Sequence, residues 1–175
     1  MKLRSELEPD IEATQKIFPG VLELISRYDE ACDNDDSQTV ATVIAEINTL
    51  TNKNIREEDL FEYWESESKE EVAFKFSVPA PIKVDAITRY ELLEIIQRMQ
   101  SFEDPGIADK LSASGFPSSS AIVLIYEYYL PLLERNFSYP EPYELFNRRQ
   151  VNGEFIELTA EEIANEILSH KPIEL

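Results

Sequence analysis

The side chains that most often carry out catalytic chemistry are scarce in this sequence. It contains one histidine, His170, and one cysteine, Cys32. His170 stands at the end of the last predicted helix, where a cation complements the helix dipole and needs no catalytic role. Cys32 stands among carboxylates, which disfavour the reactive thiolate. The serine-rich run 112–120 lacks a Gly-x-Ser-x-Gly elbow, and four scattered glycines form no phosphate loop. We therefore predict no catalytic residue, no enzymatic activity and no cofactor.

One stretch approaches a metal-binding pattern. Oxygen-bearing side chains alternate in it as at the start of an EF-hand calcium loop, at Asp33, Asp35, Ser37 and Thr39. The position of the required glycine holds Gln38, however, and the position of the bidentate glutamate holds Ile44. A single histidine and a single cysteine also exclude the usual zinc ligand sets. The sequence predicts no metal site, although a weak cation site among these acids remains an alternative.

The excess of acidic residues points to a kind of partner. The chain has 35 Asp and Glu against 16 Lys and Arg, a formal net charge of −19. Such a surface repels nucleic-acid phosphates, whose binding depends on Lys and Arg, and it repels an anionic membrane face. It steers basic proteins toward itself. We predict a basic protein partner, no nucleic acid and no membrane; the alternative is that the charge serves solubility alone.

A concentration of acids within 57–71 is the strongest candidate for the partner surface. If this segment is helical, Leu60, Phe61 and Trp64 share one side, and Glu58, Glu62 and Glu65 lie near the other. Tyr63 would add an aromatic anchor to the steering charge. The candidate partner-binding residues are Glu58, Asp59, Glu62, Tyr63, Glu65, Glu67 and Glu70, with Asp33, Asp35 and Asp36 of a second cluster. The alternative is a solvated helix face, and Trp64 is expected in the core.

The elements that must position these residues are mostly helices in the first half. We predict a helix over 8–31 that breaks at 18–20 (Phe-Pro-Gly), an acidic loop over 33–36 that caps a second helix to about residue 50, and a third helix over 55–68. After residue 71 the apolar residues recur at every second position, as in a strand. Valine and phenylalanine alternate with smaller or polar residues from Val72 to Val78, which predicts a half-buried strand ended by prolines.

The second half combines helices with a hairpin. Capping-box pairs, Thr88 with Glu91 and Thr159 with Glu162, open two helices, the latter running to about residue 170. We predict a short helix that ends near residue 115 and a second helix over 118–136. The second helix is apolar on almost every face, so we expect it to be buried, and Pro131 should kink it or end it.

Asn152 and Gly153 form a favoured hairpin turn before a predicted strand over 154–158. In that register Arg148 faces Glu157 and Arg149 faces Ile156; the upstream arm 145–151 is a strand or a helix.

The sum is an α+β fold, a mostly helical single domain over 1–175 with about six or seven helices and a sheet of roughly three strands. The alternative division is a helical lobe over 1–68 and an α+β remainder over 69–175. A single cysteine forms no internal disulfide, the first residues resemble no signal peptide, and the apolar run 121–133 is too short to span a bilayer. We therefore expect a cytoplasmic protein.

In size and acidity the chain is similar to bacterial immunity and antitoxin proteins as a class, although it carries no family motif. The leading hypothesis is an inhibitor that neutralises a basic toxin, expected to be a nuclease, through acidic helices. The alternative is a non-enzymatic structural or regulatory subunit that associates through a hydrophobic surface at 121–133. An enzyme that works with carboxylates alone comes third. The sequence predicts no particular oligomeric state.

Overall fold

The computed structural model describes residues 3–101, 105–117, 119–151 and 153–170. These residues form a mostly helical fold with eight α-helices and one antiparallel sheet of two strands. The predicted mixture of helices and a small sheet is confirmed, but the expected third strand is a helix and the helices number more than six or seven.

The chain divides into two compact units. We call Asp10–Ala80 with Lys110–Ser120 the helical unit, and Met1–Pro9 with Pro81–Asp109 and Ala121–Leu175 the hairpin unit. Whether the chain acts as a single domain stays a prediction.

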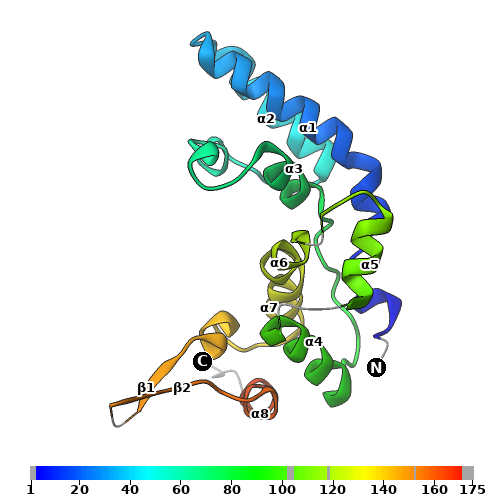
Figure 1. The fold of residues 1–175 in the computed structure, drawn as a ribbon, viewed down its shortest axis with the longest axis vertical. Coiled ribbons are helices and arrows are strands. Elements are labelled where there is room, and N and C mark those ends of the chain that lie inside the picture. Colours follow the sequence, from blue (N-terminus) through cyan, green and yellow to red (C-terminus); the bar gives the residue numbers. More distant parts are fainter. Residues whose placement is uncertain (1–2, 102–104, 118, 152, 171–175) are drawn as a thin grey trace. The chain divides into compact units, whose positions relative to one another are not determined.

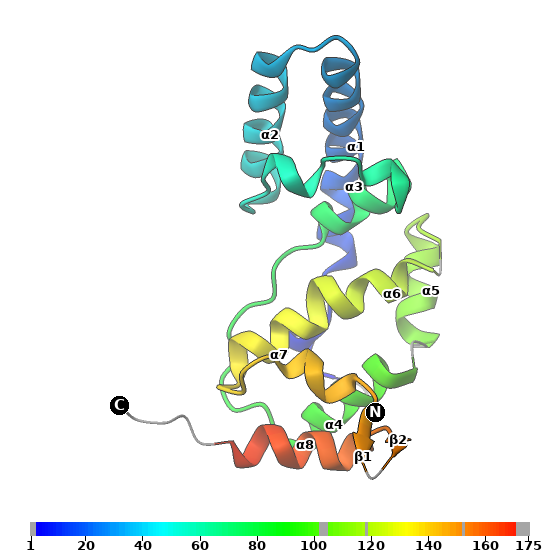
Figure 2. The ribbon, with the colours of Figure 1, turned by 90° about the vertical axis from the view of Figure 1, so that its left-hand side faces the viewer.

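Three helices build the helical unit: α1 (Ile11–Asp33), α2 (Ser37–Thr51) and α3 (Lys69–Ser77). Helices α1 and α2 lie side by side (Figures 1 and 2). As predicted, the acidic loop caps α2, since the Asp36 carboxylate accepts a hydrogen bond from the Thr39 N–H at 3.1 Å. The predicted break at 18–20 is wrong, because α1 continues through Pro19. Residues on both sides of the proline are buried, and this packing outweighs the local cost of proline.

The segment 55–68 is not the predicted helix. It forms two short 3₁₀ turns, Glu57–Asp59 and Tyr63–Glu65, separated by Glu62 in the left-handed region at φ 53°. Like charges at helical spacing disfavour the continuous helix. Leu60 is fully buried as expected, but Phe61 and Trp64 are 63% and 59% exposed, so their predicted inward position is wrong.

The predicted strand over 72–78 is also wrong, because Lys69–Ser77 is helix α3. A capping box opens the helix: the Ser68 hydroxyl accepts from the Glu71 N–H at 3.2 Å, and the Glu71 carboxylate accepts from the Ser68 N–H at 2.7 Å. The alternation misled because α3 is buried on most sides. Its buried residues are Val72, Ala73, Phe74, Phe76 and Ser77.

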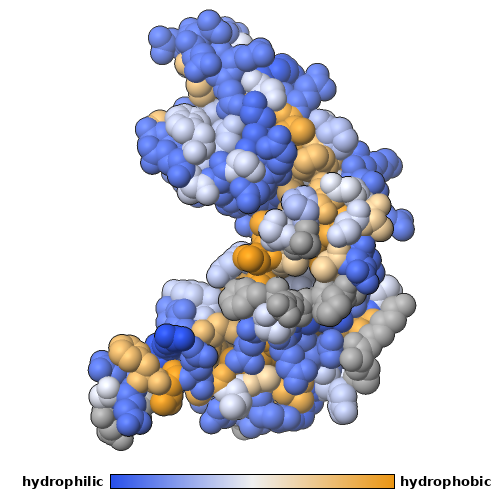
Figure 3. Space-filling view, in the orientation of Figure 1, coloured by the Kyte–Doolittle hydropathy of each residue, from blue (hydrophilic) through white to orange (hydrophobic). Residues whose placement is uncertain are grey.

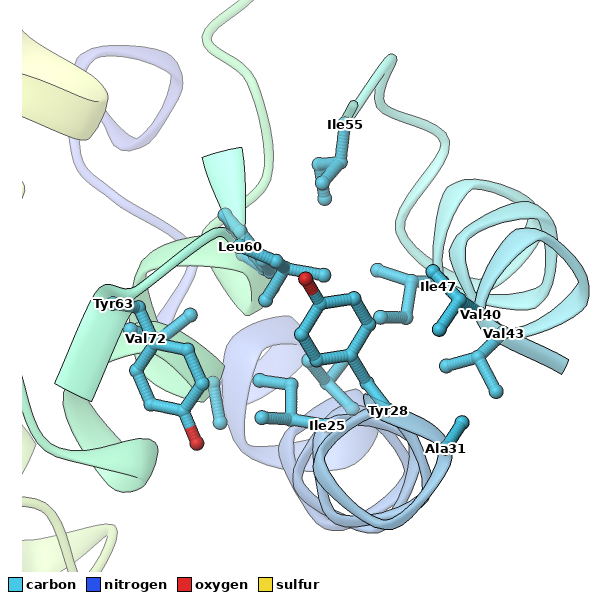
Figure 4. Packing of buried hydrophobic residues seen from close by; sticks show 13 residues of the cluster. Ile25, Tyr28, Ala31, Val40, Val43, Ile47, Ile55, Leu60, Tyr63 and Val72 are labelled. Atoms are coloured by element: carbon cyan, nitrogen blue, oxygen red, sulfur yellow. The ribbon is translucent and has the colours of Figure 1, made fainter. Parts of the chain in front are cut away.

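One core joins these elements of the helical unit. Figure 4 shows the Tyr28 ring projecting from α1 toward Leu60 and Ile47. The segment 110–120 is attached by Phe116, whose ring packs edge-on against Phe18 and Phe74 with centroid separations of 5.0 and 4.8 Å. The surface is different, since hydrophilic residues cover most of the visible face of this unit (Figure 3).

The hairpin unit contains α4 (Arg89–Ser101), α6 (Ser120–Leu124), α7 (Leu130–Asn136) and α8 (Ala160–Ser169), while α5 (Pro105–Ala113) is divided between the two units. Both predicted capping pairs are confirmed: the Glu91 carboxylate accepts from the Thr88 N–H at 2.9 Å, and the Glu162 carboxylate from the Thr159 N–H at 2.8 Å. None of the described helices has the length and hydropathy needed to cross a membrane.

The apolar segment 120–136 forms one rod in which a π-helical turn, Ile125–Tyr129, joins α6 to α7 (Figure 2). The prediction that Pro131 could end the helix is wrong, because α7 continues through it to Asn136. Pro131 has no N–H for the carbonyl four residues back and its ring crowds that carbonyl, and the wider turn lies directly before it. One side of the rod is buried as predicted, but Ile122 and Tyr126 are exposed. The buried residues are Leu124, Ile125, Tyr128, Tyr129, Leu132 and Leu133.

The predicted hairpin forms between β1 (Arg149–Val151) and β2 (Glu154–Ile156). The register places Arg149 opposite Ile156, as expected, and the Arg148 Nε lies 2.6 Å from a Glu157 carboxylate oxygen. The strand β2 is shorter than the predicted 154–158, and Asn152 of the predicted turn lies outside the described residues.

Candidate functional site

A pocket of about 250 Å³ opens on the helical unit, where α1 meets the turn Tyr63–Glu65. Asp29, Cys32 and Asp33 line it from α1, and Tyr63 and Trp64 line it from the turn. Spacings of three and four residues place the three α1 side chains on one face of the helix. Glu62 takes the left-handed conformation directly before the turn, and from there Tyr63 is buried while Trp64 is exposed. We call this site the aromatic–acidic pocket.

A hydrogen-bonded ion pair holds the inner wall of the aromatic–acidic pocket. The Tyr63 hydroxyl donates to the Asp29 carboxylate, with oxygen separations of 2.9 and 3.0 Å, and the Lys69 Nζ lies 2.8 Å from the same carboxylate. Burial, and then the hydrogen bond to Asp29, raises the pKa of the Tyr63 phenol above its usual value. Lys69 and Tyr63 thus already serve as the partners of Asp29 within the protein.

The outer wall of the pocket consists of the Asp33 carboxylate and the Trp64 indole, which are both exposed to solvent. Among the described residues, the exposed Asp33 carboxylate has no hydrogen-bond or ion-pair partner. Trp64 packs edge-on against Tyr63 at 5.7 Å between ring centroids and is otherwise open to solvent. A free carboxylate beside an open indole is suited to a guanidinium or ammonium group, which the aromatic face and the negative charge both attract.

The predicted partner-binding residues separate into two groups in the structure. Four of them have internal roles: Glu58 and Asp59 pair with Arg56, Glu67 lies 3.3 Å from Lys75, and Asp36 caps α2. The others lie at the surface without such a role, apart from Tyr63, which is buried: Asp33, Asp35, Glu62, Glu65 and Glu70.

The structure brings Asp33 and Tyr63 together in the pocket, whereas the helix that was to align Glu58, Glu62 and Glu65 does not form. The partner-binding role of these residues stays a prediction.

Three residues of the pocket were not proposed as partner-binding from the sequence: Asp29, Cys32 and Trp64. A signal for Trp64 was available. Tyr63 and Trp64 stand between Glu62 and Glu65 in a segment that is otherwise almost entirely polar, and an aromatic residue there has few apolar neighbours in sequence with which to enter a core.

The single histidine and the single cysteine of the chain have few contacts of note in the part of the chain that the structure describes. The His170 ring packs edge-on against Tyr139 at 5.1 Å, directly after the end of α8. Cys32 is exposed at the pocket. Within the described residues, no group of three His, Cys, Asp or Glu side chains is arranged to hold a metal ion.

Comparison with known proteins adds no family to this picture: no family model, no curated protein and no solved structure matches the chain.

Proposed function

We propose that this chain is an acidic protein-binding protein that captures a basic protein partner through the aromatic–acidic pocket. The observation that carries the proposal is the exposed Trp64 indole beside the unpaired Asp33 carboxylate in one concave site. Tryptophan and arginine are among the residues most enriched at the energetic centres of protein interfaces. A Lys or Arg side chain of the partner would enter between the indole and the carboxylate.

The surroundings of the pocket support the same kind of partner. Phe61 is as exposed as Trp64, so two large apolar side chains stand open on one short segment. The exposed carboxylates of Glu62 and Glu65 flank them in the chain. In a protein interface, buried apolar anchors slow dissociation, and a charged rim raises the association rate. A cation against the indole contributes about 0.5–1 kcal/mol when exposed and about 2 kcal/mol when desolvated.

The finer proposal is an inhibitor of the immunity or antitoxin type that works in the cytoplasm and neutralises a basic toxin. A nuclease is the expected target, because its phosphate-binding surface is basic and a protein of net charge −19 would compete with the substrate for it. The alternative, a subunit that associates through 121–133, is favoured by no observation, since six apolar residues of that segment, among them Leu124, Leu132 and Leu133, are buried in the hairpin unit.

The test is a capture experiment with matched variants. Immobilised wild-type protein, Trp64→Ala and Phe155→Ala are exposed to a bacterial lysate and eluted with a salt gradient, and the eluted proteins are identified by mass spectrometry. Phe155 is the control, since it is an exposed aromatic residue of β2 in the hairpin unit. We expect a basic protein that the wild type and Phe155→Ala retain, that high salt releases, and that Trp64→Ala loses.

The captured protein is then assayed for nuclease activity with increasing amounts of the wild type. Inhibition that is complete at a one-to-one ratio supports the inhibitor, and an unaffected nuclease limits the function to binding. Equal retention by Trp64→Ala and the wild type, or capture of acidic proteins only, removes the aromatic–acidic pocket from the function.

A further inference from the structure

A second pocket lies within the hairpin unit and is built differently. Its volume is about 240 Å³, and its walls come from α4, the π-helical turn, the start of α7 and the 3₁₀ turn Pro142–Phe146. Three aromatic rings line it, from Tyr126, Tyr143 and Phe146. The remaining lining residues are Met99, Ile125, Leu130 and Asn147. We call this site the three-ring pocket.

Two of the three aromatic rings of this pocket are exposed to solvent. Tyr126 is 58% exposed and Tyr143 is 42% exposed. Among the described residues, none of the three rings stacks on another aromatic ring, although the neighbouring Tyr128 and Tyr129 pack edge-on at 5.5 Å. Large aromatic side chains that line a concavity and remain open to solvent are typical of ligand sites.

The π-helical turn explains why Tyr126 stands at this pocket. The Leu130 N–H donates to the Ile125 carbonyl, five residues back, which widens the helix where Tyr126 emerges. Two consecutive residues of the turn, Ile125 and Tyr126, line the pocket, the first buried and the second exposed. π-Helical turns are rare in proteins, and those that occur often lie at functional sites.

A carboxylate stands at the edge of the three-ring pocket. The Asn147 side-chain amide donates to a Glu144 carboxylate oxygen at 3.3 Å, and a hydrogen bond with the same carboxylate raises the pKa of Tyr143. Glu141 adds a second negative charge near Tyr143. The pocket therefore combines π-faces, an apolar floor and a negative edge, which together suit a cation that has apolar substituents.

We propose that the three-ring pocket binds a small organic cation with an alkylated ammonium group, held by Tyr126, Tyr143 and Phe146 and attracted by Glu144. Aromatic rings replace the weak hydration of an alkylated ammonium, whereas a simple ammonium would forfeit stronger hydrogen bonds to water. An apolar cavity of about 150 Å³ holds a benzene molecule, so the larger three-ring pocket has room for a whole small cation. This site is separate from the aromatic–acidic pocket and goes beyond the function proposed above.

The test compares choline with its neutral isostere, 3,3-dimethylbutan-1-ol, by amide NMR titration of the full chain. We expect choline to shift the amide resonances of Tyr126, Tyr143 and Asn147. Since a cation–π interaction contributes about 0.5–2 kcal/mol, choline should bind about 2- to 30-fold more tightly than the alcohol. The variant Glu144→Gln should weaken the binding of choline and leave the binding of the alcohol unchanged.

Matched variants separate the rings from the fold. Tyr126→Ala should abolish choline binding and Tyr126→Phe should retain it, while Tyr90→Ala, at an exposed tyrosine of α4, should have no effect. Equal affinities for choline and the alcohol would make this an ordinary apolar pocket and overturn the proposal. So would shifts confined to other residues, no binding of choline, or binding of only a trimethyl-lysine peptide.

Discussion

The substitution Tyr63→Phe tests the inner wall of the aromatic–acidic pocket, because it removes one hydroxyl group and keeps the ring. Hydrogen bonds to charged groups contribute about 1.5–3 kcal/mol. The Asp29 side chain is 26% exposed and keeps its ion pair with Lys69, so the lower end of this range applies. We expect Tyr63→Phe to lower the free energy of unfolding by about 1.5 kcal/mol at pH 7.

The same substitution makes a prediction with a defined sign at high pH. Burial and Asp29 raise the pKa of Tyr63 in the folded state above the value of about 10 in the unfolded chain. The stability that the phenol contributes is therefore fully present below pH 10 and is lost as the pH rises toward the folded pKa. At pH 11 ionisation stabilises the unfolded wild type by about 1.4 kcal/mol. The advantage of the wild type over Tyr63→Phe should thus fall to nearly zero.

The assay is urea unfolding followed by circular dichroism at pH 7 and pH 11. Tyr90→Phe is the control, because Tyr90 is exposed and has no partner in the pocket; it should match the wild type at pH 7. Equal stabilities of Tyr63→Phe and the wild type at pH 7, or a difference that does not shrink by pH 11, would refute the proposed hydrogen bond to Asp29.

Three further substitutions test the fold by urea unfolding. The Arg4 Nε lies 2.5 Å from the Glu91 carboxylate and lowers the pKa of that carboxyl. The ionised Glu91 therefore stabilises the folded protein above about pH 4.3, and this contribution is lost as the pH falls. Wild type should therefore lose more stability than Glu91→Gln between pH 7 and pH 3, and parallel losses would contradict this. Gly20→Ala should stabilise the protein by about 0.5–1 kcal/mol, because glycine loses more backbone entropy than alanine in a helix. Its new Cβ meets only the Leu50 Cδ2, at 3.1 Å, and this exposed side chain can turn away; a destabilised variant would show that it does not. Thr159→Ala should cost about 1 kcal/mol by removing the cap of α8, and an unchanged midpoint would contradict the cap.

Local signals in the sequence predicted the ends of elements better than their interiors. The pairs Thr88–Glu91 and Thr159–Glu162 predicted helix starts because both partners of each hydrogen bond lie within four residues. The register that pairs Arg149 with Ile156 followed from a two-residue turn for the same reason. Long-range packing is absent from such signals, which is why the sequence suggested that α1 would break at Pro19.

Two of the wrong assignments in the helical unit, the strand over 72–78 and the helix over 55–68, have different physical causes. Helix α3 is buried on most sides, so its apolar pattern has no helical period, and the alternation from Val72 to Val78 resembled a strand. The capping pair Ser68–Glu71 was the local signal that would have identified the helix. In the preceding segment, repulsion among Glu58, Glu62 and Glu65 disfavours the helix that the apolar spacing predicted.

The candidate site was predictable only in part, because local sequence signals do not report long-range packing. That Asp33 belongs to an acidic cluster was evident from the sequence, but its place beside Trp64 depends on a contact between α1 and a turn thirty residues later, which no spacing rule reports. The three-ring pocket gave no sequence signal at all, because its residues come from four separate elements.

The only tryptophan and the only cysteine of the chain stand in the same pocket, and this gives the protein an unusual spectroscopic character. Since the one indole is already partly in water when the protein is folded, its fluorescence emission should change little when the core melts. It should respond instead when another molecule covers it. A dye attached to Cys32 would sit close enough to accept energy from Trp64, without any engineered residue. In this protein, tryptophan emission therefore reports events at one surface site rather than global unfolding.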